Sequence, residues 1–232
     1  MFQFGRFEAM TFDCYGTLVD WESGILRALG RMLAPQGIDV PPEQLLTAFG
    51  RHEAALEAGP YLSYREVLTG TARGVAADLG VGLDEADAER FAASVAEWPP
   101  FPDSADALAR LQTRFRLGVI TNCDDDLFAA SNAKLGLTFD WVVTAQQVGS
   151  YKPDRRNFEV ALARIGLPPQ RILHVAQSLY HDHAPAQAMG LATAWIDRRH
   201  DREGFGATPP AKALPNLVVP DMATFAALAV PG

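Results

Sequence analysis

The chain has 232 residues, a formal net charge of -8 and 48% hydrophobic residues, so it has enough apolar surface to bury a core and is not a disordered chain. No apolar run approaches the roughly 18 residues of a membrane span. The sequence is acidic overall and has no basic stripe, which argues against nucleic acid as a partner. The N-terminus has no basic stretch followed by an apolar one, as a signal peptide would have. The chain has two cysteines, too few for a disulfide framework, so we expect a cytoplasmic protein.

Short β-like runs alternate with helical patterns along most of the chain. Helical spacing is clear in Phe158, Ala161, Leu162 and Ile165, and again after a predicted N-cap at Asp103 or Ser104. The runs lie at 7–12, 115–120, 140–144, 171–176, 192–196 and 216–219. This alternation predicts the α/β class with a doubly wound, mostly parallel, Rossmann-like sheet. Polar residues end several of the runs, at the edge where such sheets bind ligands.

One long stretch departs from this alternation. Residues 18–98 show helical patterns throughout, including an apolar stripe at Ile25, Leu29 and Met32. A stiff proline-rich joint follows at 99–102. We therefore predict a core domain made of 1–17 and 99–232, and an inserted helical cap domain made of 18–98 that covers the active edge of the sheet.

Asp13 ends the first predicted strand and leads into a turn at Gly16. In isolation such an aspartate is most simply a turn residue. The octet TFDCYGTL (11–18), however, resembles the first motif of the haloacid dehalogenase (HAD) superfamily, whose aspartate forms a covalent intermediate. Thr121-Asn122, then Lys152-Pro153-Asp154, then AQSLYHD (176–182) follow in that family's order. The resemblance covers essentially the whole chain, and four ordered signals are far more specific than one.

Two positions separate this chain from the phosphatases of that family. Those enzymes have a second aspartate two residues after the nucleophile, and here that position is Tyr15. They also have a magnesium-binding acid in the fourth motif, and here it is Gln177. Magnesium prefers carboxylate oxygens, so a magnesium phosphatase is disfavoured and no metal or other cofactor is expected.

The Asp-x-Tyr-Gly-Thr pattern looks like the L-2-haloacid dehalogenase branch, which displaces halide without a metal. In that branch Asp13 would be the nucleophile. Lys152 would favour its ionised form, although a lysine is most often a solvated surface residue. By resemblance, Thr121 would bind the anionic group of the substrate and Asn122 the departing halide. The alternative for both is that they satisfy the amides of the following helix.

The cap offers Arg51, in a segment similar to the dehalogenase segment whose arginine receives halide. An exposed arginine paired with a nearby glutamate is nearly as good an interpretation. Tyr15 and Cys14, next to the nucleophile, are further candidate substrate contacts. For Cys14 a packing role is favoured, because adjacent strand residues point to opposite faces and no histidine is evidently paired with it.

Three residues of the fourth motif, Asp182 with Ser178 or His181, are candidates for orienting the hydrolytic water. A metal site at His181-Asp182-His183 is disfavoured because the spacing matches no common zinc pattern. This run differs from the one usual in dehalogenases, and so does Phe158, where a tyrosine is typical.

The residues and the resemblance together predict an enzyme that hydrolyses short 2-haloacids to 2-hydroxy acids through an ester on Asp13. The expected partners are the haloacid and the released halide, with no membrane, and the resemblance suggests a homodimer. Two alternatives stay open. One is a magnesium-dependent HAD phosphatase, and the other is a HAD-like protein that binds a small anion without turnover.

Overall fold

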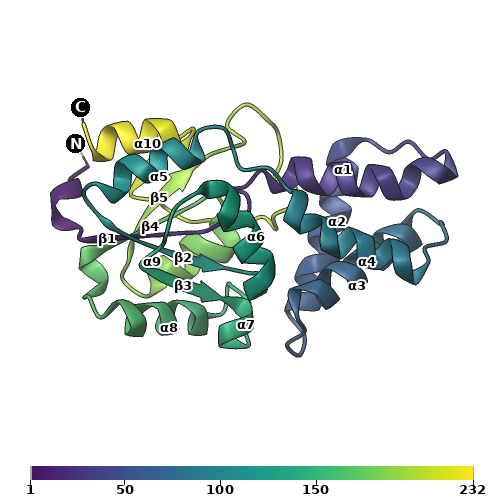
Figure 1. Cartoon of the computed structure of the whole chain (residues 1–232), viewed down its shortest axis with the longest axis horizontal. Helices are drawn as coiled ribbons and strands as arrows, with labels where there is room; N and C mark the ends of the chain where they lie inside the picture. The colour runs from purple at the N-terminus through teal and green to yellow at the C-terminus, as the bar shows by residue number, and fades with distance from the viewer. Residues whose placement is uncertain (1, 232) are drawn as a thin grey trace.

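The computed structural model describes residues 2–231, whose strands form one parallel sheet of six strands in the order β3-β2-β1-β4-β5-β6 (Figure 1). The strands are β1 (Ala9–Phe12), β2 (Arg116–Thr121), β3 (Trp141–Thr144), β4 (Ile172–Ala176), β5 (Ala192–Ile196) and β6 (Leu217–Val219). The predicted doubly wound α/β sheet is confirmed. β5 has the predicted bounds, and the other strands start one or two residues later than predicted.

Helices cover both faces of the sheet, which explains why β1 and β4 are buried along their whole length. On one face lie α5 (Ser104–Gln112) and α10 (Met222–Ala229); on the other lie α8 (Arg155–Ile165) and α9 (Ala184–Ala188). Helices α6 (Asp125–Leu135) and α7 (Ala145–Val148) follow β2 and β3. Phe158 of α8 packs with Ile120 and Val143 in the core beneath the sheet. Asp103 occupies the predicted N-cap position of α5, but its side chain makes no hydrogen bond to the amides of that helix.

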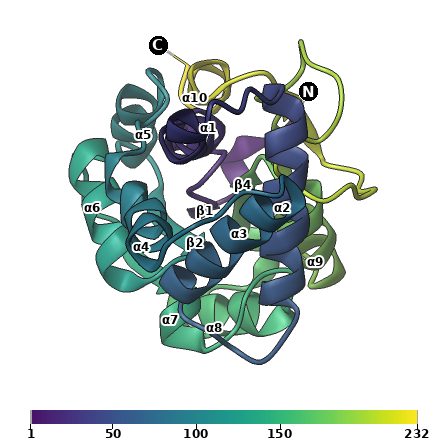
Figure 2. The same cartoon turned by 90° about the vertical axis from the view of Figure 1, so that its right-hand side faces the viewer.

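The segment 18–98, which we call the cap, contains α1 (Trp21–Leu33), α2 (Pro42–Glu57), α3 (Tyr64–Asp78) and α4 (Glu85–Ala93). Figure 2 shows these helices in front of the sheet, over the carboxyl ends of β1, β2 and β4. The two connecting segments run side by side, because Asp20 N–H donates to Pro99 O at 2.8 Å and Phe101 N–H to Leu18 O at 2.9 Å. Both chain termini lie at the opposite end of the sheet (Figure 1).

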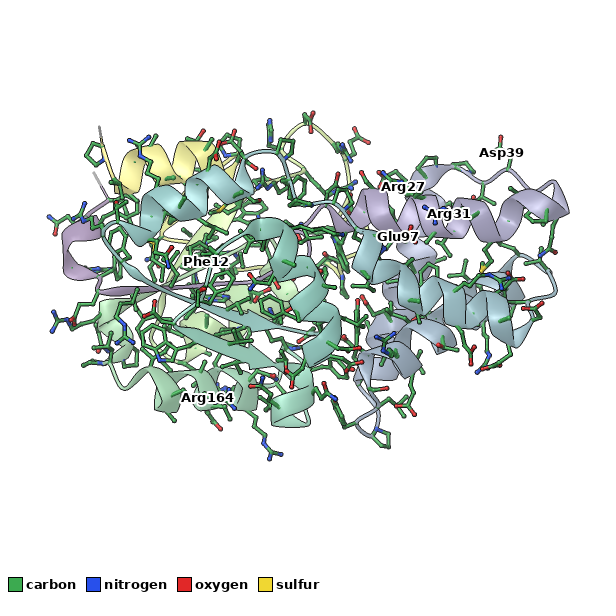
Figure 3. The ribbon with its side chains drawn as sticks, in the orientation of Figure 1. Phe12, Arg27, Arg31, Asp39, Glu97 and Arg164 are labelled. Atoms are coloured by element: carbon green, nitrogen blue, oxygen red, sulfur yellow. The ribbon has the colours of Figure 1, made fainter. Side chains whose placement is uncertain are left out.

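Capping residues define where the cap helices begin. The Asp20 carboxylate accepts from Ser23 N–H at 3.2 Å at the start of α1. Ser63 and Glu66 form a reciprocal capping box at the start of α3. Figure 3 shows Arg31 of α1 near Glu97, and their exposed ion pair of 2.9 Å adds little stability. Across residues 2–231 no helix combines the length and apolarity needed to span a bilayer.

Candidate active site

Asp13 lies directly after the central strand β1, at the carboxyl edge of the sheet and under the cap. Its backbone N–H donates to Val175 O of β4 at 3.1 Å, which extends the strand pairing as far as the carboxylate. The chain then turns at Gly16, whose φ of 93° favours glycine, and a Cβ there would lie 3.0 Å from Trp21 Nε1. The turn therefore presents Asp13 to the pocket between core and cap.

Lys152 joins two aspartates at the floor of this pocket. Its Nζ donates to Asp13 Oδ1 at 2.9 Å, to Asp182 Oδ1 at 2.7 Å and to Ile120 O at 2.9 Å. The lysine is only 1% exposed. Burial alone would lower its pKa, but the two carboxylates outweigh burial and raise it, so the ammonium is a permanent positive charge beside Asp13.

Asp182 is held from behind by a histidine that the sequence interpretation did not identify. His174 of β4 contacts Asp182 Oδ1 through Nε2 at 3.0 Å and Thr11 Oγ1 through Nδ1 at 2.9 Å. Burial would raise the pKa of Asp182, but the Lys152 ammonium and the His174 contact outweigh it and lower that pKa. The sequence signal for His174 was a histidine inside the otherwise apolar stretch 172–176.

The second oxygen of Asp13 is held by Thr17. Thr17 Oγ1 donates to Asp13 Oδ2 at 2.7 Å and accepts from Gln177 N–H at 2.9 Å. Burial raises the pKa of Asp13, and the charge of Lys152 together with the bonds from Lys152 and Thr17 opposes the rise. These fixed donors orient the carboxylate, as a nucleophile requires.

Ser178 and His181 lie together at the pocket wall, where the chain forms a π-helical turn at Leu179–His183. Ser178 Oγ accepts from His181 N–H at 2.9 Å and lies 3.2 Å from His181 Nδ1. Burial lowers the pKa of His181 to about 4, so its imidazole is neutral at neutral pH. Asp182 Oδ2 is buried without a hydrogen-bond partner within residues 2–231.

Thr121 and Asn122 follow β2 as predicted. Asn122 Oδ1 accepts from Lys152 N–H at 2.7 Å and Asn122 Nδ2 donates to Lys152 O at 3.0 Å. This reciprocal pair holds the segment that carries the lysine. Thr121 Oγ1 is buried and has no hydrogen-bond partner in the described chain, although Thr121 is not among the residues that line the pocket.

The other three residues predicted to contact the substrate, Tyr15, Cys14 and Arg51, lie in three different surroundings. Tyr15 lines the pocket, but its hydroxyl points to α6 and lies 2.9 Å from Ser131 Oγ. Cys14 is fully buried in the main core, which supports packing. Arg51 is exposed on the outer face of α2, where its guanidinium pairs with Asp78. The structure therefore does not bring Arg51 to Asp13, because residues two apart on a helix face in different directions and Glu53 faces the pocket instead.

The cap contributes two acids that the sequence interpretation missed, Glu53 and Glu57. Both line the pocket with Asp13. The signal was present in the sequence, because the apolar stripe of α2 at Leu46 and Phe49 continues at helical spacing through these two glutamates. A carboxyl group on the buried face of a helix is unusual, because burying it is costly unless it has a hydrogen-bond partner or a functional role.

The comparisons place these features in a family. The model of the haloacid dehalogenase-like hydrolases matches residues 7–190. The chain is 28% identical over 224 residues to an (S)-2-haloacid dehalogenase of Pseudomonas putida, covering 93% of each chain. It is 29% identical over 241 residues to the 5-amino-6-(5-phospho-D-ribitylamino)uracil phosphatase YigB of Escherichia coli, covering 97% of each. It shares its fold with the L-2-haloacid dehalogenase PA0810, at a TM-score of 0.80 and 24% identity, covering 97% of this chain and 100% of that one.

An α/β core with an aspartate–lysine pair under a helical cap defines a class of hydrolases. The chain belongs to the haloacid dehalogenase-like hydrolase family.

Magnesium, which phosphatases of this superfamily use, does not fit the side chains at this site. The Lys152 ammonium already binds both Asp13 and Asp182, the two carboxylates that such an ion would need. Gln177 provides no third carboxylate. No step of the proposed reaction is therefore assigned to a metal.

Proposed function

We propose that this protein is a hydrolytic dehalogenase that converts short 2-haloacids to 2-hydroxy acids through an ester on Asp13, without a metal. The observation that carries the proposal is the buried Lys152 ammonium, 2.9 Å from Asp13 Oδ1. Such a charge stabilises the ionised carboxylate that a nucleophile needs. The Pseudomonas putida relative, named an (S)-2-haloacid dehalogenase, supports the choice of reaction.

In the first step an Asp13 carboxylate oxygen attacks C2 of the haloacid. A carbon–oxygen bond forms, the carbon–halogen bond breaks, and the halide leaves with the bonding electron pair. Halide is a stable anion, so no acid has to protonate it, which accounts for Tyr15 in place of a second aspartate. We assign the substrate carboxylate to Lys152 and backbone N–H groups, and the departing halide to Asn122. Thr121 is not assigned a contact, because it does not line the pocket. Arg51 has no part in this mechanism because it lies outside the pocket.

In the second step water attacks the Asp13 carbonyl carbon of the ester. The bond between the former carboxylate carbon and the ester oxygen breaks, the 2-hydroxy acid leaves, and one proton passes to solvent. We assign the orientation of this water to Asp182, whose Oδ2 has no other hydrogen-bond partner in the described chain, with Ser178 and His181 beside it. In-line attack in the first step inverts the configuration at C2. Because the water of the second step attacks the carbonyl carbon and not C2, that inversion is kept in the product.

The proposal is tested by halide release from chloroacetate, fluoroacetate and L-2-chloropropionate with EDTA present. Wild type should release halide, and Asp13→Asn should lose at least about 1,000-fold because the nucleophile is removed. Asp39→Asn is the matched control, since Asp39 is exposed at the tip of the cap (Figure 3). In a single turnover in heavy-oxygen water, label should enter Asp13 before it enters product.

Other results would favour the alternatives. Label in the product on the first turnover contradicts the ester. Release of phosphate from phosphate esters that needs magnesium and stops with EDTA would favour a phosphatase, the activity for which the YigB relative is named. Binding of 2-hydroxy acids with no turnover, unchanged in Asp13→Asn, would favour a non-catalytic anion-binding protein.

A further inference from the structure

Two buried carboxyls of the cap share the pocket of Asp13. Glu53 and Glu57 lie one turn apart on α2, both line the pocket, and the Glu57 carboxyl faces Asn122 and His181 of the core. Glu53 is 3% exposed as a residue and the side chain of Glu57 is 6% exposed. They form the cap side of the pocket, whereas Lys152 and Asp182 belong to the core.

The protein groups around these acids are neutral hydrogen-bond donors. Tyr64 O–H donates to Glu53 Oε1 at 2.8 Å, and Asn122 Nδ2 donates to Glu57 Oε2 at 3.2 Å. His181 Nε2 lies 3.9 Å from Glu57 Oε2, and this imidazole is neutral at neutral pH. Neither acid has a permanently charged partner among the contacts of residues 2–231.

The nearby basic side chains are engaged elsewhere. Lys152 binds Asp13 and Asp182. Arg51 pairs with Asp78 on the outer face of the same helix. Arg199 pairs with Glu22 and Glu43 at the joint of core and cap. The described pocket lining therefore contains four carboxyl groups, Asp13, Asp182, Glu53 and Glu57, and one ammonium, Lys152.

In a pocket whose carboxyl groups outnumber its ammonium groups four to one, a positively charged group of the ligand can pair with carboxyls that lack a cationic partner. Buried carboxyls without a cation are costly, and an ion pair formed inside the protein offsets that cost. A second observation points to a hydrogen-bond donor in the same pocket: Asp182 lines it, and its buried Oδ2 lacks a hydrogen-bond partner within the described residues. This oxygen is assigned to water in the second step, and before that step it is free to accept from the ligand.

We propose that Glu53 and Glu57 form a subsite for an ammonium group of the substrate, so that the preferred substrates are short 2-haloacids that also carry an amine. The carboxylate of such a molecule lies at the Lys152 end of the pocket, and its ammonium lies between the two cap acids. The reacting carbon is then held between two charged anchors. The assignment of the halogen rests on the proposed function, whereas the ammonium subsite is a property of binding alone.

The titration of the two acids agrees with this geometry. Burial raises the pKa of Glu53 to about 8. Burial and the neighbouring Glu53 raise the pKa of Glu57 well above its ordinary range. A buried carboxyl with no cation beside it retains its proton, and an ammonium placed there lowers its pKa again. Binding of an amine therefore releases protons.

The test measures binding to Asp13→Asn by calorimetry, so that no chemistry is needed. The probes are 3-amino-2-hydroxypropionate and 4-amino-2-hydroxybutyrate, each compared with its amine-free counterpart, lactate or 2-hydroxybutyrate. We expect the better amino acid of the two to bind at least about tenfold more tightly than its counterpart, which corresponds to about 1.4 kcal/mol. Adding Glu53→Gln and Glu57→Gln should abolish that preference.

The matched control is Glu89→Gln, which removes the same charge from an exposed position of α4 and should keep the preference. Equal binding of each pair overturns the proposal. A preference that survives both glutamine substitutions also overturns it, as does failure of both amino acids to bind at millimolar concentration. Halide release by wild type decides the proposed reaction separately, so the two failures are distinguishable.

Discussion

At the scale of single residues, the site is a set of buried charges of which only some are paired. Lys152 forms ion pairs with both Asp13 and Asp182, and His174 adds a further contact to Asp182. Within residues 2–231, the only hydrogen-bond partner of the Glu53 carboxyl is the Tyr64 hydroxyl. Burial raises the pKa of each carboxyl. At Asp182 the ammonium and His174 outweigh burial and the pKa is lowered, whereas Asp13 and Glu53 keep a raised pKa.

The raised pKa of Glu53 predicts a pH-dependent loss of stability. Between the ordinary value of 4.5 and the folded value of about 8, the folded protein holds a proton that the unfolded chain releases. The contribution of this group to stability is therefore lost as the pH rises through that window. In Glu53→Gln the loss is absent.

Thermal unfolding of wild type and Glu53→Gln at about pH 5 and about pH 8.5 measures this effect. The melting temperature of the variant minus that of wild type should be more positive at the higher pH. A difference that is the same at both values would contradict the prediction. Glu89→Gln, at an exposed position, controls for a change of net charge.

At the scale of elements, α1 shows how two glycines of one helix differ in their surroundings. A Cβ on Gly24 would lie 2.3 Å from Cγ of Trp98, which is buried at the joint between cap and core. A Cβ on Gly30 would meet nothing within 4 Å. The helix therefore approaches the joint closely at its first turns and is free at its far end.

Alanine at the two positions should have opposite effects. Gly24→Ala forces Trp98 to move and should lower the free energy of unfolding by roughly 1–3 kcal/mol. Gly30→Ala improves helix propensity at an exposed site and should raise it by roughly 0.5–1 kcal/mol. Denaturant unfolding of both variants is the measurement. Stabilisation of both variants would show that the packing of Trp98 against α1 is looser than described, and destabilisation of both would contradict the prediction for Gly30.

At the scale of the whole molecule, the loop between β5 and β6 joins core and cap. Arg199, on this loop, pairs with Glu22 of α1 and Glu43 of α2. Further along, Ala207 N–H donates to Glu22 Oε1 at 3.2 Å, and Thr208 lines the active pocket. The loop therefore holds the cap against the catalytic edge, and the position of Glu53 and Glu57 depends on it.

Arg199→Met should loosen this closure. The variant leaves the buried Glu22 with only the longer contact of 3.8 Å to Arg202 as an ion pair among the described residues. We therefore expect lower thermal stability and a KM raised by about tenfold or more, with a smaller change in kcat. The control is Arg27→Met, since Arg27 lies exposed on α1 (Figure 3). A fall in kcat with no change in KM would instead indicate that Arg199 acts on the chemistry.

The expected homodimer and the cytoplasmic location stay predictions.

Much of the fold and half of the site follow from local signals. The strands, the helices of 18–98 and the sequence positions of Asp13, Lys152 and Asp182 could all be predicted, because each has its own local pattern of apolar spacing or motif. Apolar spacing and local motifs could not decide whether Arg51 reaches the pocket. Its neighbours in sequence resemble a dehalogenase segment, but the angular position of a side chain around a helix decides whether it enters the pocket, and Glu53 is the one that faces inward.

The sequence by itself determined the α/β class, the family and the position of Asp13 at the end of the first strand, since these depend on short-range patterns. Only the tertiary structure decided which charges meet. Lys152 reaches Asp13 and Asp182 across 139 and 30 residues of chain, and Glu57 reaches Asn122 across 65. The balance of charge in a buried pocket is the sum over side chains from distant segments, so it exists only once the cap has closed over the edge of the sheet.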